Sequence, residues 1–478
     1  MRRVYTLVLF VVMGSIDNTV LILLPELAPR IRHEFGVANH PIGLLMGLTL
    51  AVVALTGLAW GYRSDQTDRR RLLIVGTLTW AIPIAAVPFS RTYLTLCALV
   101  LLAAVGLGCI ATVGYSIITD LVPARWRGFL LGLWGGAQAL GALTGGLLAG
   151  LLAPSAGWRA PFGLMALVGV ACSGLSLLAA SPRKGQADTL LYALNEQERA
   201  DDERITYADL GTILHTATNR WLMLQGFLAQ FTYGSLTWVT ALLTVKLVGQ
   251  GLDLQRANGV AALLWVFLQC GGVVALGWGW LGDWLQRRHP QARALIGAYG
   301  FWAAIPCFVV LFWTPLPLMG SHDGTAGAIV LRQIAGNGWW WVALLGAAVA
   351  VIAQAANAPN WFALVSEVNL PEHRGTAFSF VNLANNLGRA LGAFLVGATF
   401  DWLQQVLAAP ANYTLGLSLF QVFFVPAGLC FWFAARMSLQ DAARVQRHLG
   451  QRVDRQQPRR RPRTVAAVGD RVAPGLSK

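Results

Sequence analysis

The sequence predicts an all-α integral membrane protein with twelve transmembrane helices, arranged as two six-helix pseudo-repeats with both termini in the cytoplasm. Three observations favour this fold class. Of the 478 residues, 56% are hydrophobic and 12% are charged, which is unlike soluble domains of this length. Apolar stretches of the roughly 20 residues that a spanning helix needs recur along the whole chain. Two short charged signatures also occur once in each half of the chain, at equivalent positions.

Twelve apolar stretches are long enough to span a bilayer. They cover residues 4–26, 41–62, 72–90, 94–118, 129–152, 160–180, 220–246, 257–281, 294–314, 340–364, 376–400 and 415–437. The first is expected to stay in the mature protein, because polar residues interrupt it and no small-residue cleavage site follows. All six cysteines fall inside these stretches, where they are expected to be small buried side chains rather than disulfide partners or metal ligands.

The spans divide the chain into two halves. Residues 1–180 form an N-terminal six-helix bundle and residues 220–437 form a C-terminal one. The polar segment 181–219 between them is predicted to be a cytoplasmic central loop, in which ADLGTILHTA has the spacing of an amphipathic helix on the membrane face. Residues 438–478 are predicted to be a basic, disordered cytoplasmic tail.

The net charge of +14 is concentrated in the tail and in alternate loops. By the positive-inside rule, this pattern places both termini and the basic loops in the cytoplasm. The tail is therefore expected to lie near anionic lipid headgroups, and no nucleic-acid partner is expected. A monomer in a bacterial inner membrane is the expected state.

Each half carries a signature made of a glycine, an aspartate four residues later and two arginines. The two copies are Gly61, Asp65, Arg69 and Arg70, and Gly279, Asp283, Arg287 and Arg288. A second signature, DLVPARWRG at 120–128 and EVNLPEHRG at 367–375, precedes the fifth span of each half. Two signatures repeated in the same order favour a tandem six-plus-six bundle.

The first signature suits a conformational latch. Its glycine lets a helix end approach a neighbour closely. Its aspartate can meet an arginine or a helix N-terminus in one conformation and leave it in another. The alternative is that the arginines only set the topology of the chain.

These signatures resemble those of the major facilitator superfamily, whose loop between the second and third helices carries Gly-x-Leu-Ala-Asp-Arg-x-Gly-Arg-Arg/Lys. The first copy keeps the glycine, the aspartate and the two final arginines, and departs at Arg63, Gln66 and Asp68. The resemblance covers essentially the whole chain. It implies a secondary active transporter of a small organic or amphipathic solute, in which two halves rock around a midplane site.

Asp17 is the candidate proton-coupling residue. It lies about 20 Å along the first helix from Val4, at 1.5 Å per residue, and is therefore deep in the membrane. Burial disfavours the charged form of a carboxyl group, so protonation can bias an inward-to-outward equilibrium. The alternative is a structural aspartate that is hydrogen-bonded to neighbours such as Asn18.

Polar side chains recur at helical spacing in several spans, and each such face must turn toward protein or a cavity. In the superfamily, the first, fourth, seventh and tenth helices line the substrate cavity. The candidate cavity residues are Asn18, Thr112, Tyr115, Ser116, Gln230, Tyr233, Thr237, Gln354, Asn357, Asn360, Trp361 and Arg389. Arg389, on the eleventh helix, either binds an anion or pairs across the interface between halves. Helix packing is the alternative role for the amides.

Two finer resemblances leave the transporter class open. GGAQALGALTGGLLAG in the fifth span is similar to an antiporter signature, except that Ala142 replaces its proline, and its small residues predict close helix crossings. Asp17, Thr19 and the run GYSIITDLVPARWRG look similar to spinster-type lysolipid transporters, with departures at Asn18 and Leu107. A drug/proton efflux pump and a spinster-like carrier are thus alternatives, as is a non-transporting sensor or assembly factor.

No enzyme motif occurs in the sequence. It lacks HExxH, Gly-x-Ser-x-Gly and the ATP-binding pattern GxxxxGK[ST]. No enzymatic activity, cofactor or metal site is therefore expected.

Overall fold

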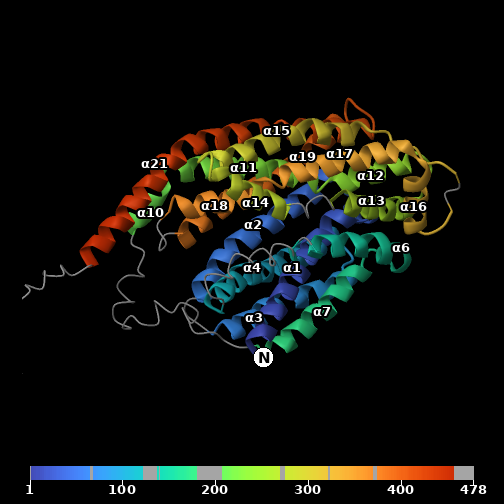
Figure 1. Cartoon of the computed structure of the whole chain (residues 1–478). Helices are drawn as coiled ribbons and strands as arrows, with labels where there is room; N and C mark the ends of the chain where they lie inside the picture. The colour runs from blue at the N-terminus through green and yellow to red at the C-terminus, as the bar shows by residue number, and fades with distance from the viewer. Residues whose placement is uncertain are drawn as a thin grey trace, which may run out of the picture.

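The structure is a computed structural model, and it describes residues 2–64, 68–121, 137–138, 140–179, 207–269, 275–320, 323–369 and 374–456. In these residues the regular structure is helical throughout. Figure 1 shows two groups of helices side by side, one from each half of the chain. The all-α class is confirmed.

The N-terminal half begins with one long helix. α1 reaches Phe35, nine residues beyond the predicted span, because Leu27, Ala28 and Ile31 continue its buried face past Glu26. Pro25 and Pro29 lie inside this helix. The elements of this half are α1 (Arg2–Phe35), α2 (Asn39–Ser64), α3 (Arg69–Ala86), η1 (Val87–Phe89), α4 (Tyr93–Leu121), η2 (Leu148–Leu152), α6 (Ala153–Ala156) and α7 (Ala160–Ser176).

The C-terminal half divides several predicted spans into shorter helices that continue one another, for example at Thr237 and Trp238. Its helices are α10 (Tyr207–His215), α11 (Ala217–Leu236), α12 (Val239–Val248), α13 (Leu254–Gln269), α14 (Ala275–Gln286), α15 (Ala292–Trp313), α16 (Ala326–Gly336), α17 (Gly338–Gln354), α18 (Asn357–Glu367), α19 (Arg374–Leu403), α20 (Ala411–Gln421) and α21 (Phe424–Gln456). α10 confirms the helix expected in the second part of the central loop; residues 180–206 lie outside the described residues.

Eight segments of the described chain are long and apolar enough to cross a membrane, and four shorter apolar helices accompany them. The count of twelve spans and the side on which the termini lie stay predictions. α16 lies between the predicted spans 294–314 and 340–364, where the sequence predicted no span. It forms because Thr325 caps its first turn, accepting a hydrogen bond from the backbone N–H of Ala328, and because Ile329 and Val330 are buried.

α21 extends into the segment that the sequence assigned to the tail. Its Asp441 is buried and accepts hydrogen bonds from the backbone N–H and the hydroxyl of Thr218, at 3.0 and 2.7 Å. Thr218 lies in the first turn of α11, where backbone N–H groups lack helical partners and the helix dipole favours an anion. This contact fastens α21 to the bundle at Asp441, and the helix continues to Gln456, whereas residues 457–478 lie outside the described residues.

Glycines bring the two halves into close contact. A Cβ atom on Gly47 of α2 would lie 2.7 Å from the carbonyl oxygen of Ala390 on α19. At a second crossing, a Cβ on Gly259 of α13 would lie 3.2 Å from the carbonyl oxygen of Gly150 in η2. Gly150 belongs to the small-residue stretch of the fifth span, so the predicted close crossing is confirmed there.

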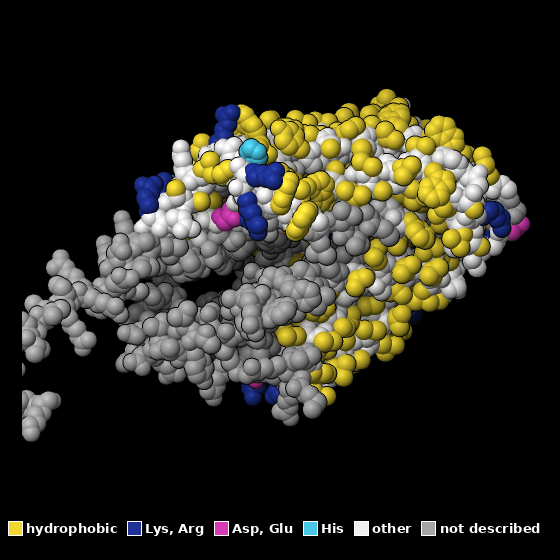
Figure 2. All heavy atoms as spheres, in the orientation of Figure 1, with side chains coloured by type: hydrophobic (Ala, Val, Ile, Leu, Met, Phe, Trp, Pro, Cys, Tyr) yellow, Lys and Arg dark blue, Asp and Glu magenta, His cyan; other side chains and the backbone are white. Residues whose placement is uncertain are grey.

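The outer surface suits a lipid environment. Figure 2 shows hydrophobic side chains over most of the visible flank, with charged side chains toward the two ends of the molecule. Phe89, Leu94 and Val406 are among the large apolar side chains left exposed. The protein is an integral, multi-pass membrane protein.

Candidate functional site

The two halves are tied together at one end of the bundle, which we call the sealed end. Its polar contacts join Glu26, Arg30, Arg32, Asn39 and His40 of the N-terminal half to Thr240, Gln255, Asn258, Asp401 and Tyr413 of the C-terminal half. In Figure 1 the halves lie together where α6, α12, α13 and α16 gather, and they separate toward α10 and α18. A site between the halves is thus shut off at the sealed end.

Glu26 of α1 is the acidic group at the boundary. Its carboxylate accepts a hydrogen bond from the Thr240 hydroxyl on α12 at 2.7 Å, and its backbone carbonyl accepts one from the Asn258 side chain on α13 at 2.9 Å. Only 4% of Glu26 is exposed. The sequence analysis missed this residue, and its signal was an acid within an otherwise apolar stretch.

A second network lies at the end of α1. The guanidinium of Arg32 donates to the side-chain oxygen of Asn39 and to the Tyr413 hydroxyl. Asn39 donates in turn to the Asp401 carboxylate on α19, at 2.8 Å. Because α19 and α20 belong to the other half, the bonds from Arg32 to Tyr413 and from Asn39 to Asp401 must break when this end opens.

A small pocket of about 40 Å³ lies between the halves, deeper than the sealed end. Three candidate cavity residues predicted from the sequence meet there, namely Asn18 of α1, Thr237 at the end of α11 and Arg389 of α19. Thr49 of α2 is a further polar residue of its wall. We call this space the central pocket.

Arg389 supplies the positive charge of the central pocket. It is half-buried, and it makes no hydrogen bond or ion pair with any residue that the structure describes; its Nε atom is fully buried. α11 packs closely on its backbone, since a Cβ on Gly234 would lie 2.3 Å from the Arg389 carbonyl oxygen. A guanidinium with free donors inside a membrane protein is suited to an anionic ligand.

The other polar lining groups are held in place by local bonds. Asn18 donates to the backbone carbonyl of Gln138 at 2.5 Å, which joins α1 to the fifth span. The Thr237 hydroxyl donates to the Gly234 carbonyl at 2.7 Å, and that of Thr49 to the Leu45 carbonyl at 2.7 Å. Among the described lining residues, the charged hydrogen-bond donor is the guanidinium of Arg389.

The remaining candidates of the C-terminal half lie within its own bundle. Tyr233 donates to the Gln354 carbonyl at 3.4 Å, and its ring packs against Phe301 and Phe424. Gln225 of α11 donates to Asn357 of α18 at 3.2 Å.

Three further candidates complete this set. Asn360 is buried and donates to the Ala356 carbonyl at 2.8 Å. Trp361 is also buried, and Gln230 is half-buried. The side chains of Thr112, Tyr115 and Ser116 lie outside the described residues.

Asp17 faces the interior of the N-terminal half and is not among the described lining residues of the central pocket. It is 7% exposed, and neither carboxylate oxygen has a hydrogen-bond partner among the described residues. The indole N–H of Trp80 on α3 lies near it without completing a hydrogen bond. Asn18, the neighbour considered as its partner, is bonded to Gln138 instead.

The latch residues are described only in part. Asp65, the packing around Gly61 and Gly279, and the side chains of Arg69 and Asp283 lie outside what the structure describes. Arg70 donates to the Leu177 carbonyl at 3.3 Å, Arg288 lies 4.6 Å from the Trp284 ring centre, and Arg287 is exposed.

The two repeated signatures meet in the C-terminal half. Gln286, just before the arginines of the first signature, donates to the Glu367 carboxylate of the second at 3.1 Å. Arg293 of α15 forms an ion pair with the same carboxylate. The acid of the second signature therefore holds the end of α14 and the start of α15.

Two helical halves around a central pocket, shut at one end, define a membrane transport protein of the two-bundle type. The chain belongs to the Major Facilitator Superfamily, because the model of that family matches residues 6–328. It is accordingly a transporter and not an enzyme.

Similar proteins include several carriers of small organic solutes. The cis,cis-muconate transport protein of Acinetobacter baylyi is 24% identical over 353 residues, covering 70% of this chain and 83% of that protein. Protein spinster of Drosophila melanogaster is 24% identical, covering 79% of this chain and 58% of its own length. The gallate transporter of Pseudomonas putida is 26% identical, and the match covers 57% of this chain and 63% of that protein. The chain thus spans less than two thirds of the last two proteins.

Solved structures share the fold. A bacterial homologue of the human lysosomal transporter spinster, in an inward-facing and unoccupied conformation, gives a TM-score of 0.72 at 19% identity, covering 92% of this chain and 98% of that chain. A D-xylose-proton symporter gives a TM-score of 0.65 at 16% identity, covering 90% of this chain and 98% of that chain. The likeness to spinster-type proteins suggested by the sequence is confirmed at the level of the superfamily.

Proposed function

We propose that this protein is a secondary active transporter of small organic carboxylates, and that Arg389 binds the carboxylate in the central pocket. The observation that carries the proposal is a guanidinium without a counter-ion in the described chain, placed between the halves. Such a group favours an anion over a neutral solute.

The names of the similar proteins support the same class of cargo. They include transporters of cis,cis-muconate, gallate and sulfoacetate, and an exporter of citrate. Each of these solutes is an organic acid that is anionic near neutral pH. The proposal refines the sequence-based expectation of a small organic or amphipathic solute.

Transport proceeds by alternating access. The present conformation is shut at the sealed end, so the pocket exchanges its solute toward the opposite end. Positive-inside charge would make that opposite end cytoplasmic. To expose the pocket on the other side, the halves rock, which breaks the Glu26–Thr240 and Arg32–Tyr413 contacts and closes the end near the latch residues.

Proton coupling through Asp17 belongs to the same proposal. Asp17 and Asn18 are adjacent on α1, yet Asp17 faces the N-terminal bundle while Asn18 lines the central pocket. A change in the charge of Asp17 would alter how α1 packs on α3, and would reach the pocket through Asn18. The proton would accompany the anion and reduce the charge that crosses the membrane.

Uptake into proteoliposomes tests the proposed cargo. Radiolabelled gallate and cis,cis-muconate are compared with xylose, a neutral solute, in wild type, Arg389→Lys and Arg389→Ala. We expect uptake of the acids by wild type, a partial loss in Arg389→Lys and a loss of about 1.5–3 kcal/mol of binding, roughly 10- to 150-fold in affinity, in Arg389→Ala. Equal loss for a neutral solute would assign Arg389 to packing and contradict the proposal.

A spinster-like lysolipid carrier is the second candidate, which the similarity to protein spinster favours. The same proteoliposomes test this candidate, by measuring whether lysophosphatidylcholine competes with gallate uptake. Competition by the lysolipid, together with no saturable uptake of either acid, would favour the second candidate over the first.

A further inference from the structure

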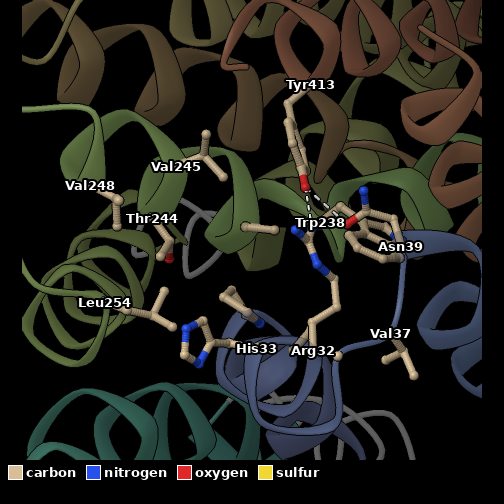
Figure 3. Close-up of a pocket in the computed structure, with 14 residues that line it drawn as sticks. Arg32, His33, Val37, Asn39, Trp238, Thr244, Val245, Val248, Leu254 and Tyr413 are labelled. Atoms are coloured by element: carbon tan, nitrogen blue, oxygen red, sulfur yellow. Dashed lines mark hydrogen bonds between the residues drawn. The ribbon is translucent and has the colours of Figure 1, made fainter. Parts of the chain in front are cut away.

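A second pocket, larger than the central pocket, is present in the described part of the chain. It has a volume of about 430 Å³ and lies at the sealed end, between the last turns of α1 and the helices α12 and α20 (Figure 3). We call it the outer pocket. Because α1 comes from one half and α12 and α20 from the other, any molecule in it contacts both halves.

The walls of the outer pocket are mostly apolar. Val245 and Val248 of α12 and Leu254 of α13 line one side, and the rings of Trp238 and Tyr413 lie on another (Figure 3). Such a surface suits the hydrocarbon part of a small ligand.

The polar part of the outer pocket is basic. Figure 3 shows both Arg32 and His33 entering it from α1, with the His33 ring near Leu254 and the Arg32 guanidinium directed toward Tyr413. Arg32 binds two neutral oxygens, those of Asn39 and Tyr413, and no carboxylate among the described residues. Its charge is fixed in position by these bonds, and its remaining N–H groups are available to a ligand.

The acidic side chains near the outer pocket already have hydrogen-bond or ion-pair partners. Asp401 accepts from Asn39 and from the backbone N–H of His40, at 2.8 and 2.6 Å. Asp253 pairs with Arg256 at 3.3 Å, and Glu34 pairs with Arg159 at 2.5 Å. None of these three acids is among the described lining residues.

We propose that the outer pocket is a second binding site for small organic acids with an apolar body, with Arg32 and His33 binding the carboxylate. The inference deepens the proposed function, because the ligand belongs to the same chemical class as the proposed cargo. The apolar walls accept a ring or a short hydrocarbon chain, and the basic side accepts the anionic group.

Occupancy of this site has a direct effect on transport. The ligand contacts both halves only while this end is sealed, so its binding stabilises the sealed state over the state that is open here. High concentrations of the acid on this side of the membrane are therefore expected to slow the transport cycle.

Site-specific labelling tests the outer pocket. Val37 lines it, so a Val37→Cys variant of the full chain is reacted with a membrane-impermeant maleimide, with wild type reporting the background from native cysteines. Gallate at about ten times its Kd is expected to slow labelling about tenfold, by mass action. The same protection is expected when Arg389→Ala is added, because Arg389 belongs to the central pocket. Val248→Trp, which fills the outer pocket from an exposed wall position, is expected to abolish the protection while uptake at low gallate concentration persists.

Three results would overturn the inference. One is unchanged labelling of Val37→Cys in saturating gallate although Arg389-dependent uptake is present, which leaves the proposed function intact. Another is protection that disappears with Arg389→Ala, since this would report occupancy of the central pocket. The third is protection by laurate and not by gallate, which would make the ligand a lipid-type acid. Conversely, protection by gallate without any gallate uptake would refute the proposed function alone.

Discussion

Glu26 and Thr240 are 214 residues apart in the sequence, and a hydrogen bond of 2.7 Å joins their side chains across the boundary between the two halves. The bond is fully buried, so water does not replace either partner while this end stays sealed. It belongs to a set of contacts that must break once in each transport cycle.

Thr240→Val is expected to weaken the sealed end. The substitution keeps the side-chain volume but leaves the buried Glu26 carboxyl without its donor, at a cost of about 1–3 kcal/mol. The ratio of sealed to open molecules should fall by about 5- to 150-fold. The accessibility of Met46→Cys to maleimide added at the sealed end measures this ratio, because Met46 lines the central pocket and is 4% exposed in the sealed state. Thr240→Ser, which retains the hydroxyl, is the control. Equal accessibility in the two variants would remove Thr240 from the seal.

Asp17→Asn is expected to separate proton coupling from substrate binding. The amide is close in size to the carboxyl group but does not titrate, so uptake should no longer be driven by a pH gradient, while exchange of gallate down its own gradient continues. Glu26→Gln in the same vesicles identifies which of the two buried acids of α1 carries the coupling. Full accumulation by Asp17→Asn would exclude Asp17 from that role.

Gly47→Ala is expected to destabilise the contact between halves. The added Cβ would lie 2.7 Å from the backbone oxygen of Ala390, so α2 and α19 must move apart, at about 1–3 kcal/mol. Gly174 of α7 has no atom within 4 Å of its Cβ position, and Gly174→Ala is the matched control. A thermal-unfolding scan of both variants measures the difference, and indistinguishable melting temperatures would contradict the close crossing.

Asp441→Ala is expected to loosen α21 from the start of α11. The change removes an acceptor that serves the first turn of α11, which is worth about 1–2 kcal/mol. Arg444, 3.5 Å from the same carboxylate and largely exposed, should contribute less than about 0.5 kcal/mol. Proteolysis after residue 441 should therefore accelerate in Asp441→Ala and stay unchanged in Arg444→Ala; acceleration in both would indicate that the ion pair matters more than the cap.

The fold class could be predicted because long apolar stretches and repeated signatures can be recognised directly in the sequence. The structure brings three of the candidate cavity residues, Asn18, Thr237 and Arg389, together around one pocket, and their role in binding a substrate stays a prediction. Helical spacing puts polar groups on one face, but it does not say whether that face meets a cavity or a neighbouring helix. Tyr233 and Asn357 are examples, since their partners lie within their own half.

The role of Glu26, in contrast, could not be predicted from the sequence. Nothing in its neighbourhood in the sequence identifies Thr240 or Asn258, because the contact arises only from the packing of two halves. The outer pocket is equally a product of tertiary structure, since Arg32 and Tyr413 come from the two ends of the chain. Contacts between residues so far apart in the sequence produce no periodic pattern from which they could be predicted.

The prolines of α1 have a mechanical consequence. Asn18 and Arg32 are fourteen residues apart on this helix, about 21 Å at 1.5 Å per residue, and Pro25 and Pro29 lie between them. Each proline removes one backbone hydrogen bond, so bending stiffness is lowest in that turn. α1 therefore consists of two rigid segments joined by a flexible turn at Pro25 and Pro29. A displacement of the segment at the central pocket changes the angle between the two segments and so moves the segment at the outer pocket. Pro25 lines the central pocket and Pro29 lines the outer pocket, so a ligand in either pocket bears directly on this joint and can change its angle.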